Sequence, residues 1–517
     1  MTFNEEDLET RLFINNEFVD SQHANRLTLR NPVDDSIVTE SVHLAGEKDV
    51  DYAVEVATEA FRTGPWSKFT GAQRAKCMLK FADLAEANAV RLAEIESIAT
   101  GRPKALIQYF DVAHMVEVFR CELEVPLKDY AGWADKIEGE SFIDEDGLYR
   151  IVQYEPLGVC AGIASWNATL LYVAWKMAPA LATGNTFVFK TSEKAPLGAL
   201  ALAPLFAEAG FPAGVVNILS GAAETGSLLA SHMNIAKISF TGSAFVGRLV
   251  QVAATKSNLK RVTLELGGKS PAIVFPDAPM DIALQSVGAG FLVNSGQICI
   301  AGSRVFVHAD IADKFIAGLK DIFEKASQVL GANPIEMTTS LGPVVDKKQF
   351  DRIMGMIEDG KKSAKVVTGG SRKGDKGCFI EPTIFSEPAN DSAILREEIF
   401  GPVLVVKTFK TEQEVVGLAN DTTYGLSARA LRVARKLEAG AVGINTPHMP
   451  NKNTPFGGKK QSGNGGRELG LSSSDMVLSP SSLHALTQHP SVSGKHGLQS
   501  YLEAKTIHIN MNLPSRL

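Results

Sequence analysis

Short runs of β-branched and aromatic residues alternate with helical patterns from about residue 150 onward. The first block of such runs comprises residues 186–190 (TFVFK), 214–219 (GVVNIL), 237–240 (KISF) and 261–266 (RVTLEL). Strands separated by helices pair in parallel, because a parallel connection has to cross over the sheet. The alternation therefore predicts an α/β fold built on a parallel sheet.

A second alternating block follows the first. Its strand-like runs are 303–308 (SRVFVH), 365–367 (KVV), 402–409 (PVLVVKTF) and 441–445 (AVGIN), and a helical pattern covers 310–329. A chain of 517 residues is long enough for more than one domain. We therefore expect two parallel-sheet α/β domains with a cleft between them.

One segment has a different pattern. Residues 141–158 (SFIDEDGLYRIVQYEPLG) resemble a hairpin that turns at Asp146-Gly147, since Asp-Gly is a favoured hairpin turn. The segment interrupts the first block, so we expect it to form a small β oligomerisation arm with the strand-like tail 505–510 (KTIHIN). Strand addition through such an arm favours a homodimer or a homotetramer.

The composition argues against several classes of partner. Lys and Arg number 52 against 58 Asp and Glu, a net charge of −6, whereas nucleic-acid-binding proteins usually carry a basic excess. No apolar stretch approaches the ~20 residues that span a bilayer, and the stretch 170–183 contains Lys176. The acidic N-terminus lacks the apolar part of a secretory signal, and the five cysteines form no CxxC pair. We expect a cytoplasmic protein without nucleic-acid or membrane partners.

Several common motifs are absent. Gly268-Lys269-Ser270 resembles the end of a phosphate-binding P-loop, but the glycine that the motif needs five residues earlier is replaced by Thr263. The sequence has no GxGxxG dinucleotide fingerprint and no GxSxG nucleophile elbow. The ten histidines form no HExxH or similar ligand spacing, so no catalytic metal is expected.

Six separate segments occur in an order that is specific as a set. They are Trp166-Asn167, 190–193 (KTSE), 240–243 (FTGS), 264–269 (LELGGK), 296–299 (GQIC) and 398–402 (EIFGP). Their order and spacing resemble the NAD(P)-dependent aldehyde dehydrogenase superfamily, and Trp-Asn-Ala-Thr at 166–169 resembles its fungal members. The resemblance runs from 13–20 (FINNEFVD) to the tail at 505–510.

The resemblance implies an aldehyde-dehydrogenase-like fold of three parts. Residues 1–138 and 159–267 would form the NAD-binding domain and residues 268–470 the catalytic domain. Residues 139–158 and 495–517 would form the oligomerisation arm, and the Ser-rich segment 471–494 a loop or disordered insert. The implied activity is oxidation of a small-molecule aldehyde to a carboxylic acid.

Cys299 is the catalytic nucleophile that the resemblance implies. A thiolate adds to the aldehyde carbon, and the oxyanion of the adduct then expels a hydride. A low thiol pKa would raise the reactive fraction. Cys77, Cys121, Cys160 and Cys378 stand in no such motif, so we expect them to be small buried hydrophobes.

Asn167 is the implied oxyanion donor. The family usually has Pro-Trp-Asn-Phe-Pro at this loop, whereas this chain has Ser165 before Trp166 and Ala168-Thr169 after Asn167. The loss of both prolines predicts a less rigid loop, and the Phe-to-Ala change predicts an altered substrate tunnel.

Glu265 is the implied general base, which activates the water that hydrolyses the thioester on Cys299. A carboxylate near a hydrophobic cleft can have the raised pKa that this role needs. Family members that transfer the acyl group to coenzyme A generally lack this base. The presence of Glu265 therefore favours hydrolysis to a free acid.

The cofactor site is expected at four places. A strand leads into residues 242–247, where the N-terminus of a helix suits a pyrophosphate. The resemblance implies contact with the adenosine ribose for Lys190 and Glu193, where a carboxylate favours NAD over NADP. It implies contact with the nicotinamide end for Glu398 and Phe400. The full set is Trp166, Lys190, Glu193, Gly242, Ser243, Ala244, Phe245, Val246, Gly247, Glu398 and Phe400.

The sequence departs from the family in three places, and these departures leave other interpretations of its function open. Residues 121–129 and 471–494 are additional, and a strand is absent after Ala428, directly before a segment (429–439) that matches a family helix. A lost strand exposes sheet edges and predicts a poorly folding chain. The alternatives are an inactive or scaffold-type relative and a member with semialdehyde or acyl-phosphate chemistry. The aldehyde itself, and a role in secondary metabolism, stay open.

Overall fold

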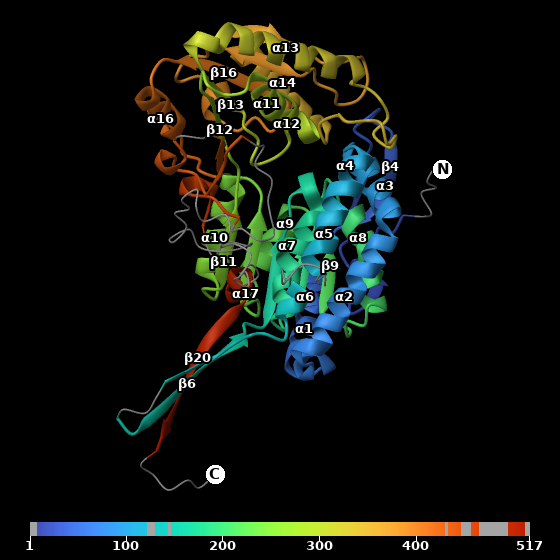
Figure 1. Cartoon of the computed structure of the whole chain (residues 1–517). Coiled ribbons are helices and arrows are strands. Elements are labelled where there is room, and N and C mark those ends of the chain that lie inside the picture. The colour runs from blue at the N-terminus through green and yellow to red at the C-terminus, as the bar shows by residue number, and fades with distance from the viewer. Residues whose placement is uncertain are drawn as a thin grey trace.

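The computed structural model describes residues 8–120, 130–142, 146–429, 433–445, 456–464 and 495–511. Two large sheets, each with helices packed on it, lie one above the other in Figure 1, and a long β arm projects from the lower part. The α/β class predicted from the alternation of strands and helices is therefore confirmed, together with the two sheets and the arm.

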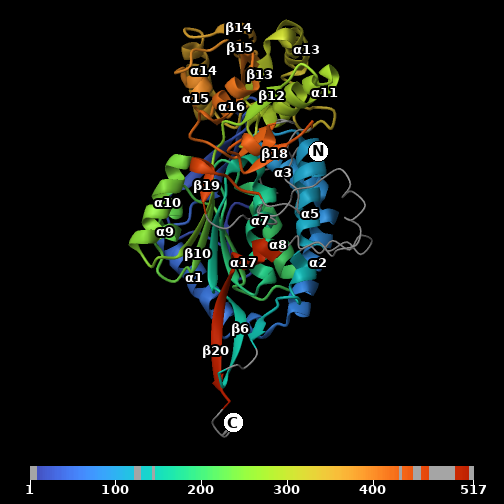
Figure 2. The ribbon, with the colours of Figure 1, turned by 60° about the vertical axis from the view of Figure 1, so that its left-hand side comes forward.

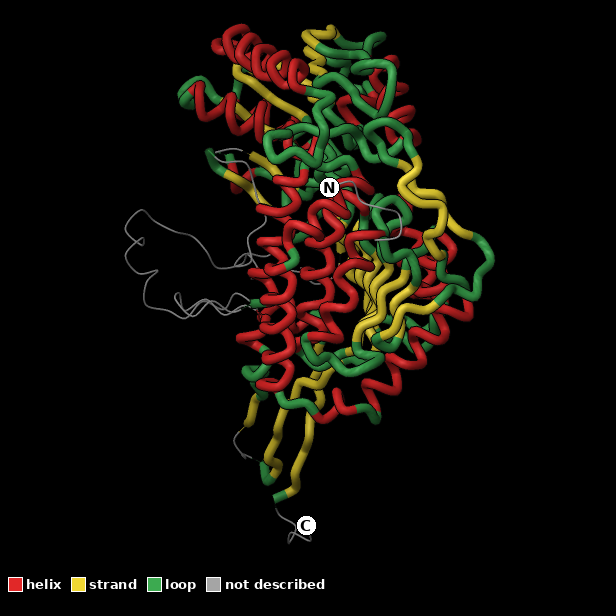
Figure 3. Tube along the Cα trace, turned by 90° about the vertical axis from the view of Figure 1, so that its right-hand side faces the viewer, coloured by secondary structure: helices red, strands yellow, loops and turns green. Residues whose placement is uncertain are grey.

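The lower sheet has eight strands in the order β19-β11-β10-β7-β8-β9-β1-β2. Their bounds are β1 Leu12–Ile14, β2 Glu17–Val19, β7 Val159–Ile163, β8 Thr186–Lys190, β9 Val216–Leu219, β10 Lys237–Thr241, β11 Arg261–Glu265 and β19 Gly463–Asn464. The five strands from β7 to β11 run parallel, and every residue of β7 to β10 is buried. Helices cover both faces of this sheet (Figure 3), so β7 to β10 are buried along their whole length rather than at alternate residues.

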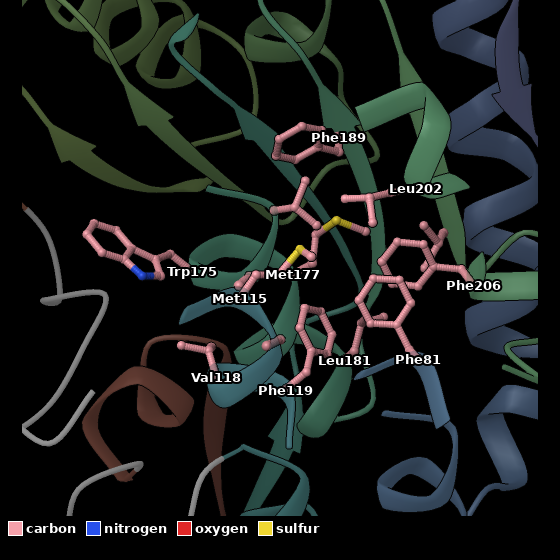
Figure 4. Packing of buried hydrophobic residues seen from close by; sticks show 14 of the residues in the cluster. Phe81, Met115, Val118, Phe119, Trp175, Met177, Leu181, Phe189, Leu202 and Phe206 are labelled. Carbon is pink, nitrogen blue, oxygen red and sulfur yellow. The ribbon is translucent and has the colours of Figure 1, made fainter. Parts of the chain in front are cut away.

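The helices around the lower sheet come mostly from the first half of the chain. They are α1 Glu47–Arg62, α2 Gly71–Ala87, α3 Ala89–Thr100, α4 Lys104–Leu106, α5 Ala113–Phe119, α6 Tyr130–Trp133, α7 Thr169–Ala182, α8 Leu197–Glu208, α9 Ala223–Ser231 and α10 Ala244–Lys256. Helix α7 (TLLYVAWKMAPALA) is buried along its whole length, as expected for a helix that is apolar on nearly all sides. It packs within the core shown in Figure 4, where the rings of Phe81 and Phe206 stack with centroids 3.9 Å apart.

The upper sheet has seven strands in the order β14-β15-β16-β13-β12-β17-β18 (Figure 2). Their bounds are β12 Pro271–Val274, β13 Arg304–His308, β14 Lys365–Thr368, β15 Thr383–Ser386, β16 Val403–Phe409, β17 Ser427–Arg429 and β18 Ala441–Gly443. The accompanying helices are α11 Met280–Leu284, α12 Gly290–Leu292, α13 Ala312–Val329, α14 Lys347–Gly360, α15 Ala393–Arg396 and α16 Glu412–Asn420. Strands β3 Arg26–Arg30 and β4 Ile37–His43 form a separate antiparallel pair.

The segment after Ala428 differs from the expectation. The strand predicted to be absent is present as the three-residue β17. Of the segment 429–439, where a helix was expected, Arg429 belongs to β17 and the described residues 433–439 contain a 3-10 turn at Ala434–Lys436, while residues 430–432 lie outside the described part. Strand β12 explains the difference, because its edge carries backbone groups that need partners and β17 supplies them. The pairing is brief: β17 meets β12 at Ala272↔Arg429 alone.

The arm consists of β5 Glu140–Phe142, β6 Leu148–Pro156 and β20 Leu502–Asn510. The hairpin and the pairing of the tail are both confirmed, and β20 begins earlier than predicted, at Leu502. Strands β20 and β6 pair antiparallel over their full length, from Leu502↔Pro156 to Asn510↔Leu148. Helix α17, Lys495–Gln499, leads into this strand.

Several predictions concern residues that the structure does not describe. The additional segments 121–129 and 471–494 lie outside the described residues, and so does Cys121. The domain boundaries stay predictions, and β19 at Gly463–Asn464 returns from the upper part to pair with β11 of the lower sheet. Within the described ranges, no helix combines the length and the apolarity needed to cross a bilayer.

The aromatic stack of Figure 4 gives a test of the core. Phe206→Ala should lower the free energy of unfolding by about 3–5 kcal/mol, because it removes a fully buried ring that stacks on Phe81. Urea unfolding followed by circular dichroism measures the loss. The matched control is Phe245→Ala, whose ring is 68% exposed and should change stability little. Similar losses in the two variants would contradict this assignment of the core.

Candidate active site

Two cavities open at the carboxyl ends of the parallel strands in the lower sheet. Strands β8, β10 and β11 end at Lys190, Thr241 and Glu265, so their last side chains meet at one edge of the sheet. The cysteine cavity, of about 120 Å³, is lined by Asn167, Glu265 and Cys299. The large cavity, of about 1000 Å³, is lined by Lys190 among others. Thr241 lines both, so the two cavities adjoin.

Cys299 follows a tight turn of the chain. Residues Asn294, Ser295 and Gly296 have positive φ angles of 52°, 54° and 70°, which aim the next residues back toward the lower sheet. Among the described cysteines, Cys299 is the one whose side chain is not fully buried. Cys77, Cys160 and Cys378 are buried, as predicted.

The thiol of Cys299 is not activated in this form of the protein. Burial raises its pKa to about 12, and the negative charges of Glu398 and Glu265 contribute to the rise. The backbone N–H groups of Cys299 and Ile300 act in the opposite direction. The low pKa expected for a reactive thiol is therefore not found, and the sulfur is a protonated thiol at neutral pH.

The amide of Asn167 is fixed from both sides. Its Nδ2 donates to the carbonyl of Gln297 at 3.0 Å, and its Oδ1 accepts from the hydroxyl of Tyr172 at 3.1 Å. Asn294 Nδ2 also donates to the backbone carbonyl of Asn167, at 3.3 Å. These three bonds replace the rigidity that the two missing prolines would supply. An amide nitrogen has two N–H groups, so one remains to face the cavity.

A buried ion pair supports both loops, and sequence reasoning missed it. Arg102 donates to the two carboxylate oxygens of Asp111 at 2.5 and 3.1 Å, and both side chains are almost fully buried. Arg102 Nε also donates to Asn294 Oδ1 at 3.1 Å. Asn294 in turn donates to the carbonyls of Asn167 and Gln297. No local pattern could have shown this network, because Arg102 and Asn294 are 192 positions apart.

The wall of the cysteine cavity is largely apolar. Phe110, Leu171, Trp175 and Phe456 line it, and they come from three separate parts of the chain. Sequence reasoning missed these residues, although Leu171 and Trp175 stand four positions apart on α7, a spacing that places them on one helix face. An apolar wall beside a polar end suits a ligand with a reactive polar head and a hydrocarbon body.

The large cavity lies at the N-terminus of α10. Ser243 caps this helix, because its Oγ accepts from Val246 N at 3.3 Å. The remaining free N–H groups and the helix dipole suit an anionic group. Of the predicted residues, Trp166, Lys190, Glu193, Gly242, Ser243, Phe245 and Val246 line this cavity.

Lys190 and Glu193 line the same large cavity as the start of α10. Lys190 Nζ donates to the carbonyl of Thr191 at 2.9 Å. Burial lowers the pKa of Lys190 to about 8, and the charge of Glu193 opposes this shift. An ammonium donor and carboxylate acceptors together can bind hydroxyl groups of a sugar.

The other predicted cofactor residues line neither cavity. Ala244 is not part of the wall, and Gly247 allows α10 to pack on β11, since a Cβ there would lie 2.6 Å from Leu266 Cδ2. Phe400 meets the ring of Trp166 edge-on with centroids 5.4 Å apart.

The carboxylate of Glu398 lies against the glycines that follow Glu265. Its Oε1 accepts from Gly268 N at 2.9 Å, and a Cβ on Gly267 would lie 2.0 Å from its Oε2. Burial raises the pKa of Glu398 to about 7. In the described part of the chain, no group of three or more His, Cys, Asp or Glu residues could hold a metal ion.

Comparison with known proteins agrees with this geometry. The family model for the aldehyde dehydrogenase family matches residues 18–481. An aldehyde dehydrogenase of Alternaria alternata is 46% identical over 91% of this chain and 94% of its own length. One from Emericella nidulans is 44% identical over 97% of this chain and 95% of its own. The chain therefore belongs to the aldehyde dehydrogenase family.

A solved structure shares the fold as well. An aldehyde dehydrogenase of Bacillus cereus, determined as its complex with NAD⁺, superimposes with a TM-score of 0.88 at 38% identity, covering 98% of this chain and 97% of that one. The predicted resemblance to this family, including its fungal members, is confirmed. The predicted enzyme class, an oxidoreductase of the aldehyde dehydrogenase type, is confirmed with it.

The buried ion pair should be essential for stability. Asp111→Asn leaves the guanidinium of Arg102 buried without a counter-charge, and we expect a loss of about 3–5 kcal/mol in the free energy of unfolding. Thermal and urea unfolding measure it. The control is Asp421→Asn, which breaks an exposed pair with Arg396 and should cost less than about 1 kcal/mol. Equal costs for the two variants would refute the proposed importance of burial.

The thiol should respond to the charge of Glu265. Because the pKa of Cys299 is raised, alkylation by iodoacetamide in the absence of cofactor should keep rising between pH 7 and pH 10 without a plateau. Glu265→Gln removes one charge that raises this pKa, so alkylation at pH 8 should become about two- to tenfold faster. Mass spectrometry locates the label, and Cys299→Ala gives the background. Slower alkylation of the Glu265 variant would show instead that Glu265 deprotonates the thiol.

Proposed function

We propose that this chain oxidises an aldehyde to a carboxylic acid with NAD, through a covalent intermediate on Cys299. The observation that carries the proposal is that Asn167, Glu265 and Cys299, which stand far apart in the sequence, line one small cavity. This cavity adjoins the large cavity at Thr241. A nucleophile, an oxyanion donor and a base at one point are the parts that acyl chemistry requires.

The first step is addition of the Cys299 sulfur to the aldehyde carbon. The carbonyl double bond becomes an oxyanion, to which the Asn167 side chain and the backbone N–H of Cys299 donate hydrogen bonds. Since the pKa of the thiol is about 12, its proton has to move to a base during attack. We assign this proton to solvent water, so that the carboxylate of Glu265, which lines the same cavity, stays available for the second half of the reaction.

The large cavity fits a dinucleotide. The N-terminus of α10 would bind the pyrophosphate, and Lys190 and Glu193 would bind the adenosine ribose. NAD, when bound there, supplies an acceptor for the hydride that leaves the adduct carbon. A carboxylate at Glu193 repels a 2′-phosphate, so NAD is favoured over NADP, although Lys190 could tolerate the latter. We assign the family's nicotinamide contacts to Glu398 and Phe400. Glu398 is hydrogen-bonded to Gly268 N, and the ring of Phe400 contacts the ring of Trp166.

The second half of the reaction is hydrolysis of the thioester on Cys299. Glu265 accepts a proton from a water molecule, the hydroxide adds to the acyl carbon, and the thiolate leaves. The thiolate then takes the proton back from Glu265, so that both groups return to their starting forms. Retention of Glu265 favours this route over acyl transfer to coenzyme A or phosphate. The assembled cavity favours an active enzyme over a scaffold-type relative.

We propose further that the arm joins subunits into a homodimer or a homotetramer. Strand β5 is an outer strand of the arm, its three residues are exposed, and it offers an unpaired edge to a second copy. The NAD-binding role of 1–138 and 159–267, the catalytic role of 268–470 and a cytoplasmic location are part of the same proposal.

Loss of the thiol tests the mechanism. Cys299→Ala should reduce NADH production from any responsive aldehyde to background, because no covalent adduct can form, while NAD binding measured by calorimetry persists. Asn167→Ala should lower kcat by about 10²–10³-fold, as expected for loss of one oxyanion donor. The control is Cys378→Ala, a buried cysteine away from both cavities. Full turnover by Cys299→Ala would exclude the proposed mechanism.

A further inference from the structure

Arg429, the last residue of β17, is a buried cation that lines two cavities. Its side chain is 8% exposed. It forms part of the wall of the cysteine cavity, and it also lines a third cavity of about 320 Å³ beside β12. The proposed reaction gives Arg429 no role.

The guanidinium of Arg429 lacks a counter-charge among the described residues. Its Nη1 donates to the carbonyl of Ser286 at 2.8 Å, and its Nε has no hydrogen-bond partner there. No Asp or Glu of the described part lies within ion-pair distance of it. Burial lowers its pKa to about 10, so the group stays charged at neutral pH. A buried charge without a partner is strongly unfavourable, unless a ligand supplies the partner.

The guanidinium is close to the loop of the nucleophile. A Cβ on Gly302 would lie 3.6 Å from both Cζ and Nε of Arg429. Gly302 follows Cys299 by three positions, and three residues span at most about 11 Å. Cys299 and Arg429 both line the cysteine cavity, so a ligand that fills this cavity can contact both residues.

The other charges of the cysteine cavity are already accounted for. Arg102 is paired with Asp111, so these two side chains neutralise each other. Glu265 lies where the proposed reaction takes place. Between these groups the wall is apolar, with Leu171, Val293 and others. Among the described residues that line this cavity, Arg429 is therefore the cation without an anionic partner.

We propose that Arg429 binds a carboxylate at the far end of the aldehyde substrate, so that the preferred substrates are short aliphatic aldehydes with a terminal carboxylate. The inference rests on the proposed function and adds the substrate class. The carboxylate would accept hydrogen bonds from Nε and from the remaining N–H groups of the guanidinium. Its methylene groups would lie along the apolar wall, and the aldehyde carbon would face Cys299.

Matched substrate pairs test the proposal. For aldehydes of four to six carbons, kcat/KM is measured for the terminal acid and for its methyl ester, with NAD and the full-length enzyme. We expect the wild type to prefer the acid by about tenfold or more, as for a charged hydrogen-bonded pair. Arg429→Met should abolish this preference and leave the rates of the esters nearly unchanged, and Arg429→Lys should retain part of it. The matched control Arg435→Met changes an exposed arginine and should keep the preference.

A binding experiment separates failure of this inference from failure of the proposed function. In the Cys299→Ala background, aliphatic dicarboxylates of four to six carbons should raise the melting temperature when Arg429 is present and not in Arg429→Met. Without ligand, Arg429→Met should melt at a higher temperature, because it removes an uncompensated charge. A variant that melts lower and responds to dicarboxylates like the parent would overturn the anion site.

The remaining outcomes are also decisive. Equal kcat/KM for acids and esters would overturn the substrate class, even if dicarboxylates bind at Arg429, since the site would then serve a free carboxylate. Absence of turnover with every aldehyde, together with Arg429-dependent binding of dicarboxylates, would overturn the proposed function and the substrate class while leaving the anion site itself established.

Discussion

The Arg102–Asp111 ion pair is the contact on which the geometry of the cysteine cavity depends. Both side chains are almost fully buried, and the Nε of Arg102 also donates to Asn294, whose amide donates to the carbonyls of Asn167 and Gln297. The loop of Asn167 and the loop of Cys299 are therefore attached to one rigid point. Buried charges require complete pairing, and this requirement allows few alternative arrangements of the two loops.

The same burial that fixes the loops disfavours a negative charge on the sulfur of Cys299. Removal of water from Cys299 raises the pKa of its thiol, and the carboxylates of Glu265 and Glu398 add to this effect. The site is thus arranged so that charge on the sulfur is unfavourable until an electrophile arrives. Once the sulfur has bonded to a carbonyl carbon, the charge resides on oxygen, where the N–H donors can stabilise it. A partly buried cysteine with a high pKa is in this sense compatible with a reactive one.

The sequence predicts what depends on local pattern or on spacing within short motifs. Strands β8 and β10 lie where the apolar runs 186–190 and 237–240 predict them, and the cysteine cavity unites Asn167, Glu265 and Cys299. Contacts between residues far apart in the sequence were not predicted, because no pattern near Arg102 indicates that it contacts Asn294. In the segment where a helix was expected over 429–439, Arg429 instead belongs to β17 and pairs with Ala272 of β12, a contact that the local pattern does not reveal. Gly247 stays a predicted cofactor residue, and the structure adds that a Cβ there would lie 2.6 Å from Leu266 Cδ2.

The brief pairing of β17 and the cation that lacks a counter-charge among the described residues occur at the same place in the fold. β17 pairs with β12 at one position, and the residues of β12 from Ala272 onward border a cavity that Arg429 also lines. The guanidinium of Arg429 lies beside Gly302, three positions after Cys299. The sheet thereby holds a positive charge next to the loop that carries Cys299, and a charge in that position would select among substrates by their anionic groups.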